Sequence, residues 1–341
     1  MKLTENSKNA YNGQDYLEPW VSYTKQTEEV NYNKGKDWSQ EYMTLEFLGN
    51  GDFRIWVASY GWNNPTFVSG MSYSLNEGEW VDFEYEGNFE YGTVAQSYAV
   101  QVHTGDMMRL RANGASATGS MSEDRRNLRG TYFYSDSNYN VMGNVMSLLY
   151  GDDFRTCSLD LTDIEHYGMI TFKAGDNDVY HAGKGPVDAS NFVLPATALT
   201  ENCYQGMFTA CEDLISAPKL NAIELADGCY CDMFSGCNLL TESPVLPAET
   251  LAEDCYMRMF HFCNNMLRIT CLATSDPSGN GFGPSEGNYW VDNSIDFGGT
   301  LVVSENSDSS IRAKMTPESC LCEWRIEDED GNYIGTHECS D

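Results

Sequence analysis

The sequence predicts a multidomain, mostly β protein that combines an N-terminal antiparallel β-sandwich, a short α/β repeat solenoid and a C-terminal β-rich segment. Three observations support this fold class: a 26-residue repeat in the middle of the chain, alternating apolar strands joined by turn residues before it, and further strand patterns after it. The chain has 341 residues, of which 41% are hydrophobic, and this is enough apolar material for packed cores.

The repeat is the strongest of the three observations. Segments 194–219, 220–245 and 246–271 align without gaps at a period of 26 residues. A short, partly apolar stretch at 240–246 contains Pro244 and predicts a short strand exposed at an edge. In the third copy, apolar residues have the i, i+4, i+5, i+8, i+9, i+12 spacing of one face of an α-helix. These residues are Leu251, Cys255, Tyr256, Met259, Phe260 and Cys263.

One helix and one strand in each copy place the period in the leucine-rich-repeat range of roughly 20–29 residues. A single copy cannot bury its own apolar face, so we expect the copies to stack into a solenoid. Such a stack needs a cover at its exposed end, and the residues before the first copy are the candidate cover.

Before the repeat, turn residues between alternating apolar segments predict three consecutive hairpins. Asn50-Gly51 is the strongest of these turn signals. Successive hairpins favour an antiparallel sandwich. The predicted pairs are 43–47 with 53–57, 73–75 with 80–83, and 98–102 with 107–111, and segments 131–134 and 141–149 complete the domain.

After the repeat, a strand at 300–303 and a hairpin of 323–327 with 333–336 are predicted, the hairpin turning at Asp330-Gly331. The N-terminal residues are polar with scattered Tyr and Trp, as in an arm that orders against a partner, and a solvated tail is the alternative. The predicted parts are a polar N-terminal arm (1–38), a β-sandwich-like domain (39–150), a capping or degenerate repeat (151–190), the 26-residue repeats (191–274) and a C-terminal β-rich segment (275–341).

The charge balance excludes one large class of partner. Lys and Arg number 20 against 51 Asp and Glu, which gives a net charge of −31 at pH 7. So acidic a chain repels the phosphates of nucleic acids, and we expect no nucleic acid partner. No run of 18 apolar residues is present, so we expect no membrane insertion.

The cysteines of the repeats are interpreted as small buried hydrophobes. Two cysteines of one copy are eight residues apart, about 12 Å along a helix, and neighbouring helices pack about 8–10 Å apart, so neither distance suits a disulfide. The six residues are Cys203, Cys211, Cys229, Cys237, Cys255 and Cys263.

Metal and phosphate sites are weakly indicated elsewhere. Cys320, Cys322, His337 and Cys339 could bind zinc, form a disulfide or remain free thiols; the one-residue gap between the first two favours free thiols. Segments 176–178 and 328–330 are acidic but lack the spacing of an EF-hand, which favours turns, and 279–284 favours a plain loop. We therefore predict no metal site and no cofactor.

The pattern LPAxxL…CYxxMFxxC…LxxxP resembles the BspA-like leucine-rich repeats of surface proteins from gut Bacteroidetes. Segments 43–53, 71–80 and 144–154 are similar to the β-rich part and connector that precede such repeats, so the resemblance covers roughly residues 40–274. It implies adhesion or partner binding on an exterior surface and no catalysis, and it transfers no functional residue. Family members usually carry an export signal and many have more repeats than three.

Positions that vary between otherwise constant copies are the candidate binding residues. A rigid stack holds such residues in rows, which suits partner recognition, although neutral surface variation is the alternative. The candidates are Gln205, Asp232, Met257, Arg258 and His261.

We expect a non-catalytic, surface-displayed adhesion or structural protein. The sequence from Met1 lacks the apolar stretch of a secretion signal, and surface-type modules without such a signal favour a route outward in a virion. The preferred interpretation is a phage virion protein, a head- or tail-associated fibre or decoration that contributes to host or glycan attachment and lies on the virion surface. Its expected partners are other structural proteins through the N-terminal arm, a host surface protein or glycan, and further copies of itself in a homo-oligomer.

Three alternatives remain open. A bacterial cell-surface adhesin lipoprotein would have the same architecture. A carbohydrate-active enzyme would use carboxylates of the sandwich. A glycan-binding module would use aromatic side chains such as Trp56, Tyr60 and Trp62.

Overall fold

The structure is a computed structural model of the whole chain. The structure describes residues 36–59, 70–86, 94–112, 120–121, 128–162, 170–173, 183–283, 290–291, 299–307, 309–315 and 324–337. Residues 37–341 belong to one compact unit, and the first 36 residues to another. The predicted N-terminal arm therefore lies outside the described residues, apart from its last three.

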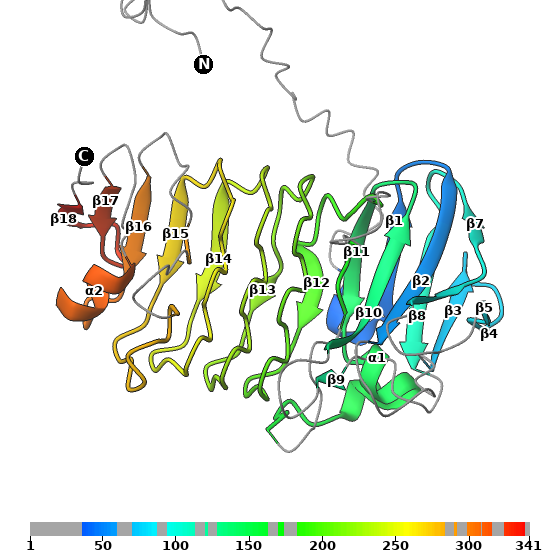
Figure 1. Cartoon of the computed structure of the whole chain (residues 1–341), viewed down its shortest axis with the longest axis horizontal. Helices are drawn as coiled ribbons and strands as arrows, with labels where there is room; N and C mark the ends of the chain where they lie inside the picture. The colour runs from blue at the N-terminus through cyan, green and yellow to red at the C-terminus, as the bar shows by residue number, and fades with distance from the viewer. Residues whose placement is uncertain are drawn as a thin grey trace, which may run out of the picture. The chain divides into compact units, whose positions relative to one another are not determined.

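The described part of the chain is mostly β, with few and short helices, as predicted. Its largest sheet has seven strands and includes parts of both the N-terminal segment and the repeats (Figure 1). In spatial order the strands are β13 (Lys219–Leu220), β12 (Asn191–Leu194), β11 (Tyr139–Asn144), β1 (Met43–Phe47), β8 (Met107–Ala112), β3 (Met71–Leu75) and β4 (Val81–Asp82).

Two further sheets complete the β structure. The second is built from β5 (Tyr85–Glu86), β6 (Val94–Ser97), β2 (Gly51–Ser59), β10 (Leu128–Ser135) and β9 (Ser120–Met121), with β7 (Val100–Val102) paired beside β6 on β2. The third has the order β14 (Glu242–Leu246), β15 (Arg268–Cys271), β16 (Thr300–Val303), β17 (Trp324–Glu327) and β18 (Tyr333–His337). The helices are α1 (Ser147–Tyr150), α2 (Ser309–Met315) and the 3-10 helices η2 (Trp38–Gln40) and η3 (Gly151–Thr156).

Aromatic rings from the first and second sheets meet in one core. Phe47 of β1 contacts Phe53 of β2 with ring centroids 5.6 Å apart, and Phe53 contacts Phe133 of β10 at 5.4 Å. All three side chains are fully buried. Large buried rings of this kind supply much of the apolar area that stabilises a small domain.

The predicted hairpin around Asn50-Gly51 is wrong, although both of its strands exist. β1 pairs with β11 and β8, whereas β2 pairs with β10, β6 and β7 in the other sheet. A turn signal predicts a reversal of the chain but not whether the returning strand pairs beside the first or packs across the core from it. Here the two strands face each other through their buried rings.

The other predicted pairings have mixed outcomes. The hairpin around residues 76–78 is confirmed, because β3 and β4 are antiparallel neighbours. The third hairpin is wrong for the same reason as the first: β7 pairs with β2 and β8 with β1 and β3. The predicted strand over 141–149 ends at Asn144, and α1 follows.

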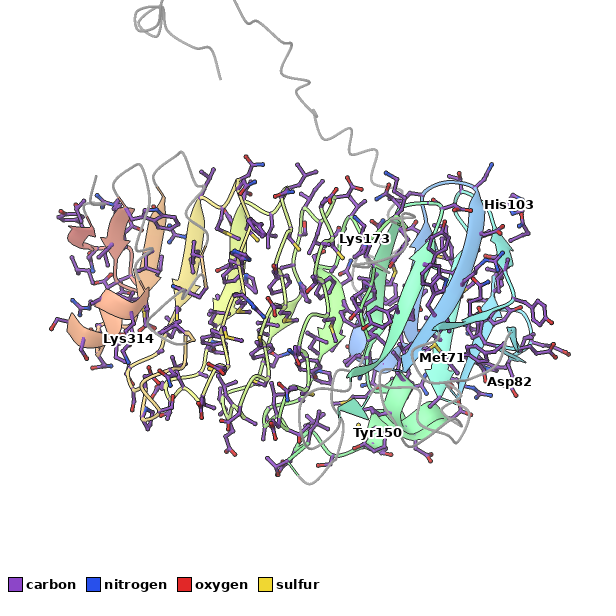
Figure 2. All side chains as sticks on the ribbon, viewed as in Figure 1. Met71, Asp82, His103, Tyr150, Lys173 and Lys314 are labelled. Carbon is purple, nitrogen blue, oxygen red and sulfur yellow. The ribbon has the colours of Figure 1, made fainter. Side chains whose placement is uncertain are left out.

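In the C-terminal segment, the predicted strand at 300–303 and the hairpin of β17 with β18 are confirmed. Asp328 accepts hydrogen bonds from the backbone N–H groups of Asp330 and Asn332, so this acidic segment is a turn, as predicted. The other acidic segment, 176–178, lies outside the described residues. Helix α2 was not predicted, and its Lys314 (Figure 2) donates to a carboxylate oxygen of Asp276 at 2.8 Å.

The helix predicted in each repeat is a run of turns instead. We call the three repeats coil 1 (194–219), coil 2 (220–245) and coil 3 (246–271). In coil 1, φ is positive at every fourth residue, namely at Asn202, Gly206 and Ala210. A right-handed helix has no place for such residues. A turn period of four residues produces the same i, i+4, i+8 apolar spacing as a helix, so the periodicity alone does not distinguish the two.

Hydrogen bonds of the turns alternate between their own coil and the next. The N–H of Met207 donates to the carbonyl of Tyr204 in the same coil, whereas the N–H of Phe208 donates to the carbonyl of Met233 in coil 2 at 2.8 Å. The same alternation joins coil 2 to coil 3, as from Phe234 to Met259. Backbone groups are therefore satisfied although the segment is neither helix nor strand.

Side chains at equivalent positions of the coils stack in buried rows. Phe208, Phe234 and Phe260 follow one another at 5.4 and 5.8 Å with nearly parallel rings. A second row of stacked rings consists of Tyr204, Tyr230 and Tyr256. The six repeat cysteines are free and fully buried, which confirms their interpretation as small core residues.

The stacked pattern extends past both ends of the three repeats. Phe172 stacks on Phe208 at 4.8 Å and donates its N–H to the carbonyl of Met207. At the other end, the N–H of Tyr256 donates to the carbonyl of Gly281, and the ring of Phe282 contacts Tyr256. Residues 275–283 thus have the backbone position of a fourth turn segment.

Candidate functional site

The five candidate binding residues all lie on the turn segments of the coils. The structure brings three of them together, because the N–H of Asp232 donates to the carbonyl of Met257 and its carboxylate accepts two hydrogen bonds from Arg258. His261 follows one turn later in coil 3, where its ring contacts that of Phe262. Gln205 lies one coil away, beside Gly206, whose N–H donates to Cys231.

The Asp232–Arg258 pair is the main charged feature of this row. The guanidinium donates from Nε and Nη2 to the two carboxylate oxygens at 2.9 and 2.6 Å. The hydrogen bonds that Arg258 donates to the Asp232 carboxylate raise the pKa of Arg258 above its usual value. Both residues have positive φ, because they occupy the column where coil 1 has Gly206. The row thus contains a half-exposed ion pair on a constrained backbone. None of its residues lines the surface hollow between coils 2 and 3.

A surface hollow of about 600 Å³ lies between coils 2 and 3 on the loops that follow the strands. Its lining is apolar with two carboxylates and a hydroxyl, and the most exposed apolar member is Ile223, at 58%. The lining residues are Ile223, Glu224, Leu225, Pro247, Glu249, Thr250 and Leu251.

The hollow is found where backbone hydrogen bonds between coils are missing. Between coils 1 and 2, the N–H groups of Leu199 and Ile223 donate to Glu224 and Thr197, respectively. Past coil 3, the N–H of Leu251 donates in the same way to Ser275. Among the described residues, no backbone hydrogen bond joins 219–226 to 242–252, and such bonds resume at Gly228, which donates to Glu253.

The sheets separate at the same junction. β13 ends the first sheet and β14 begins the third, so the two neighbouring strands are not paired. β14 contains Pro244, which has no N–H to donate, and its register against β15 shifts between Glu242 and Val245. This confirms the edge strand predicted from Pro244. The junction is therefore closed along the turn segments and open along the strands and loops.

Two acidic residues line the hollow, and the loops of the coils carry others. The three loops that follow the strands, 195–202, 221–228 and 247–254, contain six acidic residues and no Lys, Arg or His. Glu224 and Glu249 are exposed at the hollow itself. The six are Glu201, Glu224, Asp227, Glu249, Glu253 and Asp254.

The buried thiols of the coils are unsuited to nucleophilic chemistry. Burial raises the pKa of Cys203 and of Cys271 to about 12, so both thiols stay protonated at neutral pH. No cluster of His, Cys, Asp and Glu that could hold a metal ion is found in the part of the chain that the structure describes. Cys320, Cys322 and Cys339, and the side chain of His337, lie outside it.

The carboxyl groups with shifted pKa values are all shifted downward within the described ranges. Hydrogen bonds from Tyr42 and Arg111 lower the pKa of Asp152, and those from Asn76 lower that of Asp106. A general acid at neutral pH requires the opposite shift. Of the aromatic residues considered for glycan binding, Trp56 stacks on Tyr134 at 5.2 Å, and residues 60 and 62 lie outside the described residues.

Comparisons with protein-family models, with curated proteins and with solved structures find no match. Among the described residues, no helix has the length and apolar character needed to cross a bilayer.

Sequence reasoning missed the hollow and its residues. One signal was available: the column of Ile223 changes to Glu249 in the next copy, so an apolar residue stands where an exposed carboxylate is tolerated. The loss of hydrogen bonds at a single junction has no such signal, because Pro218 and Pro244 occupy the same column of the repeat. Pro218 nevertheless precedes β13, which pairs with β12, whereas Pro244 lies in β14, whose edge toward β13 is unpaired.

Proposed function

We propose that this chain is a non-catalytic binding and display protein in which a short leucine-rich-repeat solenoid, similar to that of BspA-like surface proteins, extends from an antiparallel β-sandwich. The observation that carries the proposal is the register of the coils. Rings and thiols of the same type are buried in rows, so the side chains that vary between coils are held at fixed positions on the surface.

Several features support a binding role over catalysis. Burial raises the pKa of the coil thiols, hydrogen bonds lower the shifted carboxyl pKa values, and the hollow between coils 2 and 3 combines four apolar residues with two carboxylates and a hydroxyl. Rigid scaffolds with variable exposed positions are typical of recognition proteins. We place the protein on the surface of a virion that infects gut Bacteroidetes, with a bacterial cell surface as the alternative, on the strength of the repeat pattern.

The test compares attachment with hydrolysis. Beads that carry the full chain should bind gut Bacteroidetes cells, and antibodies to the chain should label purified virions from the same community. A charge-balanced variant exchanges the charges of one pair, Asp232→Arg with Arg258→Asp, and leaves the net charge of the chain unchanged. Reduced attachment by this variant would assign the turn row to the binding surface.

Two results would overturn the proposal. One is the absence of the chain from virions together with the absence of attachment to any cell. The other is glycan hydrolysis by the purified chain that is lost when a single Asp or Glu is replaced.

A further inference from the structure

We propose that the hollow between coils 2 and 3 binds an extended, basic segment of a partner protein, with an apolar side chain of that segment seated beside Ile223 and Leu225. The inference rests on the proposed function, because it names the chemistry of a partner for a binding protein. It concerns a surface other than the turn row, and its test is independent of virion or cell attachment.

The first argument is the open junction. Where coils 1 and 2 meet, the N–H of Leu199 is bonded to the carbonyl of Glu224, and where coil 3 continues, the N–H of Leu251 is bonded to that of Ser275. Leu225 occupies the same column at the open junction, and its N–H has no such bond. Extended peptides bind where a protein offers unpaired backbone groups beside pockets for side chains.

The second argument is the apolar floor. Leu225, Pro247 and Leu251 line the hollow together with Ile223, which is more than half exposed. Exposed apolar side chains are common singly, but a group of them in a concave surface is a candidate contact site. An apolar side chain of a partner would remove Ile223 from water and fill the space between the two loops.

The third argument is charge. Glu224 and Glu249 lie on the two loops that border the hollow, and the loops of coils 1 to 3 carry six acidic residues without a basic one. Lysines or arginines on both sides of the apolar anchor would complement these carboxylates, whereas an acidic segment would be repelled. Charge thus selects a basic occupant, and the apolar floor distinguishes it from a simple counterion.

The test uses fluorescent synthetic peptides of one length and the full chain. One peptide alternates Lys with Leu, a second alternates Lys with Ser, and a third alternates Gln with Leu. We expect the Lys/Leu peptide to bind about tenfold or more tightly than either of the others, and its affinity to fall with added salt. Equal binding of the Lys/Leu and Lys/Ser peptides would overturn the proposal, because the chain would then sense net charge alone.

Matched variants locate the site. Glu224→Gln with Glu249→Gln should weaken binding of the Lys/Leu peptide about tenfold, whereas Glu79→Gln with Glu84→Gln, which changes the net charge equally at exposed residues elsewhere, should change it less than about twofold. Ile223→Ala should weaken binding about fivefold, and Ile215→Ala, at a residue with 54% exposure, should not. Equal effects of the paired variants would overturn the proposal.

A second measurement is independent of the variants. On adding the Lys/Leu peptide, hydrogen exchange should slow at the amides of Leu225 and Thr250 and remain unchanged at Leu199. Protection elsewhere on the chain without protection at Leu225 would contradict the site. If peptides bind here while the chain is absent from virions and from cells, the proposed location fails and the peptide site stands.

Discussion

Two junctions of the same stack are built from the same sequence pattern and differ along one side. Coils 1 and 2 are joined by turn-segment hydrogen bonds, by loop hydrogen bonds and by the parallel strands β12 and β13. Coils 2 and 3 retain the turn-segment bonds and the stacked rings but lack the strand pairing and the backbone hydrogen bonds of residues 219–226. The buried rows and the turn-segment hydrogen bonds together are thus sufficient to hold neighbouring coils in register, and strand pairing is dispensable at one junction.

The largest expected effect acts on what both junctions share. Burial keeps the thiols of Cys203 and Cys271 protonated in the folded chain up to pH about 12, whereas thiols of the unfolded chain lose their proton above about pH 8.5. The stability that these groups contribute is complete below the unfolded pKa and is lost as the pH rises toward the folded one. Each such thiol lowers the free energy of unfolding by about 1.4 kcal/mol for every pH unit in this window.

Urea unfolding at about pH 7.5 and about pH 10 measures the loss, and several buried thiols together should lower the free energy of unfolding by several kcal/mol. As a control, Cys203→Ala should reduce the dependence on pH by the share of one thiol. Equal unfolding midpoints at the two pH values would show that water reaches the buried rows.

The next largest effect concerns the row of rings that crosses both junctions. Phe234 is fully buried between Phe208 and Phe260, so Phe234→Ala should destabilise the chain by about 3–5 kcal/mol. Phe262 is 54% exposed and has positive φ, so Phe262→Ala is the matched control and should cost less than about 1 kcal/mol. Chemical denaturation of the two variants decides whether the rows or the strands hold the stack together.

Amide exchange distinguishes the junctions without any substitution. The amides of Leu199, Leu225 and Leu251 occupy one column of the repeat, and two of them donate across a closed junction. We expect the amide of Leu225 to exchange on the order of tenfold or more faster than the other two under native conditions. Equal protection of all three amides would mean that the open junction closes in solution.

The sequence predicts much of the strand pattern and little of its pairing. Alternating apolar and polar residues locate β1, β3 and β8, and a short apolar run locates β16. Pairing depends on which strands lie side by side, and the turns at Gly51 and Gly105 lead into a strand of the other sheet. Turn residues report a local backbone conformation and carry no information on distant partners.

The same limit applies to the repeats and to the candidate site. The 26-residue period correctly identifies the buried columns, but a period of four residues in the turns has nearly the spacing of a helix. Gly206, Gly228 and Gly236 were the available signal, since glycine at three of the nine such positions favours positive φ. The candidate binding residues were predicted on the turn segments, whereas the hollow lies on the loops of coils 2 and 3. The hollow depends on backbone hydrogen bonds that are missing between residues 219–226 and 242–252.

The smallest expected effect lies at Arg258, in the turn segments, where the junction of coils 2 and 3 is closed by hydrogen bonds. Its guanidinium is 43% exposed, so the pair with Asp232 should contribute less than about 1 kcal/mol, and Arg258→Ala should destabilise the chain by no more than that. The φ of Arg258 is 52°, a conformation that costs other residues roughly 1–2 kcal/mol more than glycine. Arg258→Gly should therefore be more stable than Arg258→Ala, the reverse of the order found in helices. Urea unfolding of both variants checks this order, and a less stable glycine variant would mean that the turn adopts a helical backbone at this column.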